Sequence, residues 1–355
     1  MAGNCKQALV LSGGSIKGAY QAGAIQELFK PEYGFSPSMV YGISVGSINA
    51  AVLADFVGQQ LDGQQLEKSS KIDLQKAGDS LATYWKDQIK SFKDLGTKRC
   101  SLRVLWEIIF GGFAGMLNMD ELGRTLEKIV RKDNVKRAAA RGDFKFYAGT
   151  LNLTTGDYYT APYDDDRIVD YVMASAMMPI VMPLKEMTKV EPKDRDGYWL
   201  DGGVHNVAPL SAAIEEGCED IICVVCRPKK LGSVKMEDKK NLKLTALGER
   251  ISDVIAQTLL DNDLAWAEKI NGWVQSGQAP VPSNPNKPRY QEILLTVIRP
   301  DDELVFDIEK FTQTSILEMT SRGQKDAQRA MPDYMTRRSA FLARRSAASS
   351  PSTTP

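Results

Sequence analysis

The sequence predicts an α/β protein, a three-layer α/β/α sandwich with a mostly parallel central sheet. Residues 7–12 and 38–43 are short apolar runs typical of buried strands, and each is followed by a glycine-containing turn and a stretch with helical apolar spacing. A third buried strand is expected at residues 221–227. Strand, turn, helix, strand and helix in this order favour a parallel sheet with helices packed on its faces.

The other elements follow from local periodicity and from residues that end helices. Apolar residues recur at helical spacing in 45–61, and Pro179 ends the helix before it because proline cannot continue a helix. Residues 276–289 are rich in Pro, Asn and Ser and form a loop. The expected helices span 18–29, 45–61, parts of 62–100, 120–137, 166–178, 244–275 and 308–330, and further strands span 144–153 and 291–299.

Composition excludes several classes of protein. The 355 residues include 45 basic and 45 acidic side chains, so no overall field attracts nucleic acid, and no nucleic-acid partner is expected. The five cysteines are odd in number and scattered, which argues against a disulfide framework and favours a reduced, intracellular setting. Cys223-x-x-Cys226 lies in an apolar run and is interpreted as part of a buried strand rather than a metal or redox pair.

No run approaches the roughly 18 to 20 apolar residues of a spanning helix, and the N-terminus lacks a secretory-signal pattern. We therefore expect a cytoplasmic protein or one that touches membranes from outside. Residues 1–332 are expected to form one domain, and 333–355 a basic, then Ser/Thr/Pro-rich, disordered tail. Arg337-Arg338 and Arg344-Arg345 in that tail either contact anionic lipid or belong to a solvated, frayed helix.

Residues 101–117 are apolar and contain three glycines. Two interpretations stay open for them. They form either a buried core helix or a functional element, which is a mobile cap over an acyl-chain channel or a part that dips into a membrane. In the second case, replacing Trp106 and Phe110 should affect activity on vesicles more than activity on soluble esters.

Gly42-Ile43-Ser44-Val45-Gly46 matches G-x-S-x-G between an expected strand and an expected helix. A sharp strand-to-helix turn of this kind exposes the serine hydroxyl, and the helix N-terminus favours developing negative charge. A conventional triad also needs a histidine base, but the chain has only His205. The base is therefore either His205 or a carboxylate, unless Ser44 is not catalytic.

Asp201-Gly202-Gly203 supplies a carboxylate after the apparent strand Tyr198-Trp199-Leu200, although Asp-Gly is also a plain turn signal. The loop Ser12 to Gly18 follows the first strand and can present backbone N–H groups to an anion. It serves as an oxyanion hole in an acyl hydrolase or as a phosphate loop in a nucleotide-binding protein. Neither nucleotide-loop motif is matched, which favours the first interpretation.

Together these motifs resemble the patatin-like phospholipases over about residues 7 to 230, and more loosely to about 330. The similar segments are the glycine-rich loop Gly13 to Tyr20, the elbow Gly42 to Gly46, Gly115 to Asn118, the Ala-Ser segment Ala174 to Pro179, and Asp201-Gly202-Gly203 with Pro209 after it.

The resemblance implies a Ser–Asp dyad without a histidine base. Ser44 would be the nucleophile and Asp201 the base, and no metal or cofactor would be needed. The backbone N–H groups of Gly13, Gly14 and Ser15 would form the oxyanion hole. Ser12 stands where the family often has Asp, and Ser15 where a third Gly is common. The motif positions around these residues are Lys17, Gly18, Gly42, Gly46, Gly202 and Gly203.

The expected function is therefore a lipid acyl hydrolase of the phospholipase A or lysophospholipase type, acting on phospholipids or other acyl esters. Two alternatives share the fold, a non-catalytic lipid-binding or regulatory protein and an acyltransferase. Peripheral contact with a membrane would accompany a lipid substrate. His205, four residues after Asp201, is expected to be an incidental surface residue.

Overall fold

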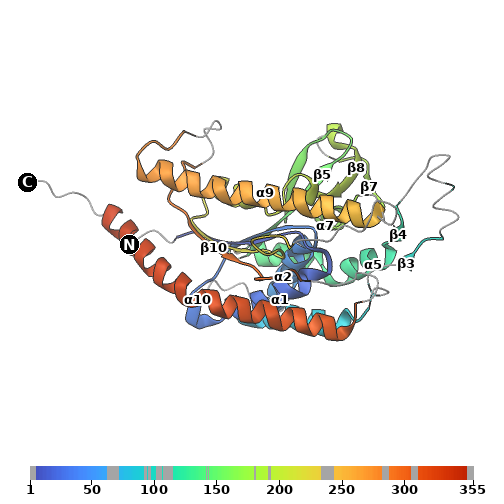
Figure 1. Ribbon diagram of the computed structural model, residues 1–355, viewed down its shortest axis with the longest axis horizontal. Helices are drawn as coiled ribbons and strands as arrows, with labels where there is room; N and C mark the ends of the chain where they lie inside the picture. The colour runs from blue at the N-terminus through green and yellow to red at the C-terminus, as the bar shows by residue number, and fades with distance from the viewer. Residues whose placement is uncertain are drawn as a thin grey trace, which may run out of the picture.

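A mixed eight-stranded sheet forms the middle layer of the protein in a computed structural model (Figure 1). The sheet has the order β10-β9-β1-β2-β5-β8-β7, and β6 pairs with β5. The structure describes residues 5–61, 72–91, 94, 97–100, 106, 115–140, 142, 144–179, 181–190, 193–232, 244–281, 288–304 and 311–349. The strands are β1 (Gln7–Leu11), β2 (Met39–Ile43), β5 (Lys145–Asn152), β6 (Tyr158–Pro162), β7 (Lys185–Met187), β8 (Gly197–Asp201), β9 (Asp220–Val224) and β10 (Leu294–Ile298).

Strands β10, β9, β1, β2 and β5 are parallel neighbours, whereas β6, β7 and β8 run antiparallel to the strands they pair with. Every residue of β1, β2 and β9 is buried, as expected for parallel strands covered on both faces. The carboxyl ends of the five parallel strands meet at one edge, which is the edge where open α/β sheets bind their ligands.

Helices cover both faces of the sheet, which confirms the expected three layers. Two separate hydrophobic clusters lie on the two faces. Figure 1 shows α9 on one side of the sheet and α1 and α10 on the other. On the α9 side lie α8 (Leu210–Glu215) and α9 (Leu244–Gln275); the other side has α1 (Gly18–Leu28), α2 (Val45–Gln60), α3 (Leu74–Gln88), α5 (Asp120–Ile129), α6 (Lys132–Ala140), α7 (Ile168–Ser175) and α10 (Gln313–Ser349).

Short elements complete the described part of the chain. β3 (Thr97–Lys98) and β4 (Leu117–Asn118) form a separate two-stranded ribbon. The 3-10 turns are η1 (Ser15–Lys17), η2 (Pro31–Tyr33), η4 (Lys193–Arg195) and η5 (Gly202–Val204). No helix among the described residues has an apolar stretch long enough to cross a membrane.

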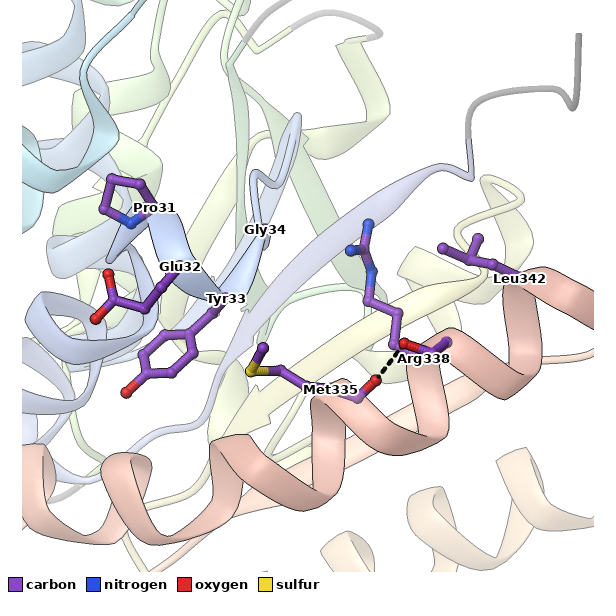
Figure 2. A pocket seen from close by; sticks show the side chains of 8 residues that line it. Pro31, Glu32, Tyr33, Gly34, Met335, Arg338 and Leu342 are labelled. Carbon is purple, nitrogen blue, oxygen red and sulfur yellow. Dashed lines mark hydrogen bonds between the residues drawn. The ribbon is translucent and has the colours of Figure 1, made fainter.

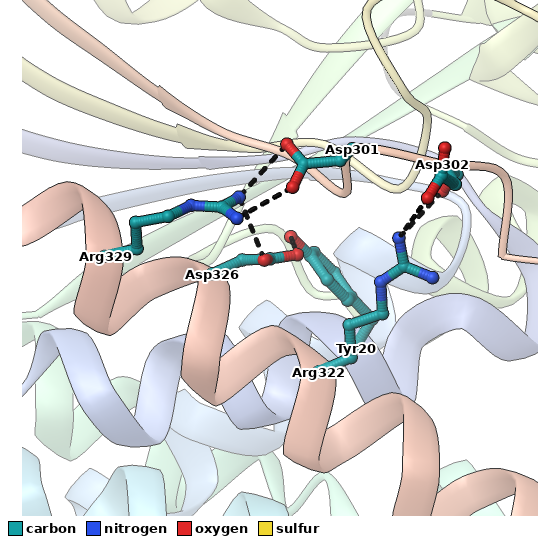
Figure 3. Close-up of polar contacts among 6 residues, drawn as sticks. All are labelled: Tyr20, Asp301, Asp302, Arg322, Asp326 and Arg329. Atoms are coloured by element: carbon teal, nitrogen blue, oxygen red, sulfur yellow. Dashed lines mark hydrogen bonds and ion pairs between the residues drawn. The ribbon is translucent and has the colours of Figure 1, made fainter.

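Two glycines bring α1 and α10 into close contact. A Cβ on Gly23 would lie 1.9 Å from the carbonyl oxygen of Thr320, and a Cβ on Gly323 would lie 1.9 Å from that of Tyr20. A polar cluster beside this crossing reinforces it (Figure 3), because the Tyr20 hydroxyl donates to Asp326 at 3.0 Å. Arg329 donates to Asp326 and to Asp301, and Arg322 pairs with Asp302.

Two sequence expectations are corrected by this packing. The helix expected over 120–137 is two helices, α5 and α6, because the buried Asp55 carboxylate accepts the backbone N–H of Arg131 between them at 3.0 Å. The tail expected to be disordered from residue 333 is helical to Ser349. Tyr334 is fully buried there, and Arg338 pairs with the buried Asp220 at 2.9 Å.

A cavity of about 210 Å³ lies where α10 passes η2 (Figure 2), lined among others by Tyr33, Met335 and Arg338. None of its lining residues belongs to the expected catalytic set. The apolar stretch 101–117, for which a core helix and a functional element were both open, falls mostly outside the described residues, as do the last six residues of the tail.

Candidate active site

Ser44 sits at the sharp turn between β2 and α2, as the G-x-S-x-G pattern predicts. Its backbone adopts φ 55° and ψ −128°, a strained conformation for a non-glycine residue, and such strain is concentrated at functional sites. The two motif glycines are required for this turn. A Cβ on Gly42 would lie 2.2 Å from the carbonyl oxygen of Gly46, and one on Gly46 would lie 2.4 Å from that of Leu11.

Hydrogen bonds hold the strained turn from both sides. The backbone N–H of Ser44 donates to Ser175 Oγ at 2.8 Å, and the Ser175 hydroxyl donates to the carbonyl of Gly149 at 2.6 Å. The carbonyl of Ser44 accepts from the backbone N–H and the hydroxyl of Ser47, which fixes the first turn of α2. Sequence reasoning did not place Ser175 in the site; its only signal was the family-like segment Ala174 to Pro179.

Sheet register brings Asp201 to Ser44. Ile43 of β2 is level with Gly149 of β5, so Ser44 is level with Thr150. Thr150 pairs in turn with Asp201 at the end of β8. The two residues therefore lie at the same height with one strand between them. The Ser44 side chain therefore lies close enough to the Asp201 carboxylate to lower its pKa.

The Asp201 carboxylate is held in a buried position, with only 7% of the residue exposed. One oxygen accepts the backbone N–H of Gly203 at 2.7 Å, and the Asp201 N–H donates to the carbonyl of Met177 at 3.0 Å. Burial raises the pKa of Asp201 to about 6, against the smaller lowering effect of the Gly203 hydrogen bond and of the Ser44 side chain. Gly202 is needed for close packing, because its Cβ would lie 2.5 Å from the carbonyl oxygen of Gly149.

The side chain of His205 makes its contacts with residues other than Ser44 and Asp201. Its side chain is exposed, and its ring stacks on Tyr158 with centroids 5.0 Å apart. Within the described part of the chain, its imidazole makes no hydrogen bond to Ser44 or Asp201. The arrangement therefore offers Ser44 a carboxylate partner and no imidazole partner.

The glycine-rich loop passes next to Ser44, since a Cβ on Gly13 would lie 3.4 Å from that of Ser44. One of the three expected oxyanion donors is already engaged, because the N–H of Gly13 donates to the carbonyl of Val207 at 3.0 Å. The N–H groups of Gly14 and Ser15 have no acceptor among the described residues. Ser15 adopts φ 52°, so a non-glycine residue is accommodated there in the left-handed region.

A chain of buried hydrogen bonds supports this loop from below. The indole N–H of Trp85 donates to Asn49 Oδ1 at 2.8 Å, and Asn49 Nδ2 donates to Gln21 Oε1 at 3.0 Å and to the carbonyl of Gly18 at 3.1 Å. Gln21 Nε2 then donates to the carbonyl of Ser12 at 2.7 Å. Asn49, Gln21 and Ser12 are fully buried. Since buried polar groups are costly when unpaired, the chain fixes the position of the loop.

Cys226 supports the same loop from the side of β9. Its backbone N–H donates to Ser12 Oγ at 3.0 Å, and the Ser12 hydroxyl donates to the carbonyl of Gly13. A Cβ on Gly14 would lie 2.6 Å from Cys226 Cβ, so this glycine permits the contact. Ser12, which replaces the acid common in the family, thus has a structural role of its own. The Cys226 thiol forms no disulfide and donates to the carbonyl of Lys17 at 3.5 Å, and burial raises its pKa to about 11.

Lys17 and Gly18 join the loop to α1. Burial and the neighbouring Arg227 lower the pKa of Lys17. Gly18 lets α1 approach α2, because its Cβ would lie 2.2 Å from a methyl carbon of Val45. These two motif positions therefore shape the loop and its surroundings, without a described hydrogen bond to the Ser44 side chain.

The assembled groups suit nucleophilic acyl transfer. A hydroxyl next to a carboxylate, at a helix N-terminus and beside unengaged backbone N–H groups, has the kinds of group that this reaction uses. The described residues contain no cluster of potential metal ligands.

Comparison with known proteins identifies the family. The family model for patatin-like phospholipases matches residues 9–214, more than half of the chain, including Ser44 and Asp201. No curated protein matches the sequence. The crystal structure of VipD from Legionella pneumophila is similar to this structure, with 14% sequence identity and a TM-score of 0.41. The alignment covers 93% of this chain and 67% of the VipD chain. Patatin-like phospholipases are lipid acyl hydrolases. On the family match, this chain belongs to the patatin-like phospholipase family.

Proposed function

We propose that this protein is a lipid acyl hydrolase of the phospholipase A or lysophospholipase type, with Ser44 as nucleophile and Asp201 as its base. The observation that carries the proposal is the strand register that places the Ser44 side chain beside the buried Asp201 carboxylate, close enough to lower its pKa. A carboxylate whose pKa is raised to about 6 is a stronger base than an ordinary aspartate and is still ionised at neutral pH.

In the first half of the reaction, Ser44 Oγ attacks the carbonyl carbon of the acyl ester while its proton passes to Asp201. The carbonyl oxygen becomes an oxyanion, which the N–H groups of Gly14 and Ser15 stabilise. The tetrahedral intermediate then collapses, the ester C–O bond breaks, and the leaving alcohol takes the proton from Asp201. The acyl group remains bound to Ser44 as an ester.

In the second half, water replaces the alcohol. The water oxygen attacks the carbonyl carbon of the acyl-enzyme while Asp201 accepts a proton from the water. The N–H groups of Gly14 and Ser15 stabilise the second oxyanion. When this intermediate collapses, Ser44 leaves and takes the proton from Asp201. The products are a fatty acid and the free enzyme. Since phospholipid substrates reside in bilayers, this function includes peripheral contact with a membrane surface.

The test is fatty-acid release from phospholipid and lysophospholipid vesicles, measured by mass spectrometry. The wild-type protein should release fatty acid, and Ser44→Ala should not, while Ser339→Ala, at an exposed serine of α10, should behave as wild type. A folded wild-type protein that binds the vesicles without releasing fatty acid would instead support a non-catalytic lipid-binding function. Transfer of the acyl group to an added alcohol in preference to water would support an acyltransferase.

A further inference from the structure

The outward side of α9 carries apolar side chains where a surface helix is normally polar. Ile251, Val254 and Ile255 are 50%, 47% and 50% exposed, and Trp266 is 39% exposed. At about 100° per residue, these four side chains fall within a sector of about 120°, in which the exposed polar residues Thr258 and Asn262 lie between Ile255 and Trp266. We call this set of four residues the α9 ridge. Figure 1 shows α9 on the side of the sheet opposite α10. The exposed fractions of its four side chains place the ridge on the solvent side of α9.

The charge of this sector has one sign. Its charged residue is Lys269, whose ammonium lies over the rings of Trp266 and Trp273 at 5.8 and 5.0 Å from their centroids. The acidic residues of the same stretch, Asp253, Asp261, Asp263 and Glu268, lie outside the sector, although Asp261 and Glu268 are exposed along one edge of it. Tryptophan and lysine side chains with apolar bodies and polar tips are typical of groups at a membrane–water interface.

The ridge begins beside the candidate active site. Asp253 of α9 forms an ion pair with Arg227, which directly follows Cys226, the residue packed against the glycine-rich loop. Gln257 of α9 donates to the carbonyl of Lys229 in the same segment. Lys229 and its neighbour Lys230 are exposed there and add positive charge next to the ridge.

We infer that the α9 ridge is the surface by which this protein docks on an anionic phospholipid bilayer. The inference rests on the proposed function, because a bilayer-borne substrate requires a docking surface near the catalytic edge of the sheet. Apolar side chains would enter the acyl–headgroup boundary, and Lys269 and Lys229 would contact anionic headgroups. An anionic bilayer presents the charge complementary to Lys269, Lys229 and Lys230.

The test compares a ridge variant with a matched control in the full-length chain. The ridge variant is Ile251→Ser with Ile255→Ser; the control is Leu317→Ser with Met335→Ser, which removes two similarly exposed apolar residues from α10. Both are made in a Ser44→Ala background, and binding is measured by cosedimentation with vesicles of phosphatidylcholine with and without phosphatidylserine. Binding measured this way does not depend on hydrolysis, so failure of the docking inference is separable from failure of the proposed function.

The ridge variant should bind the phosphatidylserine vesicles about tenfold to a hundredfold more weakly, and the control within about twofold of the parent protein. With Ser44 restored, the ridge variant should hydrolyse a soluble short-chain ester like wild type, which shows that its site is intact. Equal vesicle binding by the ridge variant and its parent would overturn the inference. So would equal weakening in the α10 control, or a ridge variant that turns a dimer into a monomer in light scattering, which would make the ridge a contact between copies.

Discussion

Replacing Asp201 by Asn should make the protein more stable at the same time as it removes the proposed base. Burial raises the pKa of Asp201 from 3.8 to about 6, so the folded protein holds the proton more tightly than the unfolded chain does. Protonation therefore favours folding, and stability is lost as the pH rises from about 3.8 through about 6. An asparagine keeps the shape of the side chain and the acceptor for the Gly203 N–H, but it does not ionise.

The size of the effect follows from the pKa difference of about 2.2 units, at about 1.36 kcal/mol per unit. Above pH 7, ionisation of the buried Asp201 lowers the free energy of unfolding by about 3 kcal/mol. At pH 4.5 the same linkage gives a cost of only about 1 kcal/mol. The stability of Asp201→Asn relative to wild type should therefore rise by about 2 kcal/mol between pH 4.5 and pH 8.

Urea unfolding of both proteins at the two pH values measures this change. Asp333→Asn, at an exposed carboxylate of α10, controls for the removal of one charge and should differ from wild type by only about 0.5 kcal/mol at either pH. A stability difference for Asp201→Asn that is constant with pH, or that falls as the pH rises, would refute the reasoning.

Three further predictions follow from the same contacts. For a soluble ester, kcat/KM should rise about tenfold per pH unit below an apparent pKa of about 6 and level off above it, because Asp201 must be ionised to act as the base. A flat pH profile between pH 4.5 and 6 would exclude Asp201 as the base. Gln21→Leu should lower kcat by about tenfold or more with little change in KM in steady-state assays, because the glycine-rich loop loses the buried hydrogen bond from Gln21 to the carbonyl of Ser12. An unchanged kcat would show that the loop keeps its position without this hydrogen bond. Arg338→Met should destabilise the fold by about 3 kcal/mol in urea unfolding, because it leaves Asp220 buried without its cation, whereas Arg344→Met at an exposed pair should cost less than about 1 kcal/mol; equal losses would contradict this.

Local sequence predicted the elements next to the nucleophile because their signals are local. The strand and helix on each side of Ser44 have their own apolar periodicity, and the glycine pattern marks the turn between them. The approach of Asp201 is different, because it depends on the register of β2, β5 and β8 across more than a hundred residues. Periodicity carries no information on that register, and the pairing of the two residues was expected only from the family resemblance.

Other parts of the site and fold depend on contacts that no local pattern encodes. The engagement of the Gly13 N–H by Val207 reduces the expected oxyanion donors to Gly14 and Ser15, and it depends on a loop nearly two hundred residues away. The tail from residue 333 was expected to be disordered, yet Tyr334 and Arg338 both bond the buried Asp220, and this long-range packing stabilises the helix.

The most direct test of the Ser44–Asp201 dyad is kcat/KM on a soluble short-chain ester for three variants that circular dichroism shows to be folded. Ser44→Ala and Asp201→Asn should each lose about three orders of magnitude or more, and their combination should be little worse than either alone, because groups of one catalytic unit fail together. His205→Ala should stay within about threefold of wild type, because the imidazole has no described contact with either residue. A folded His205→Ala that is as inactive as Ser44→Ala would contradict the dyad and place the histidine in the mechanism.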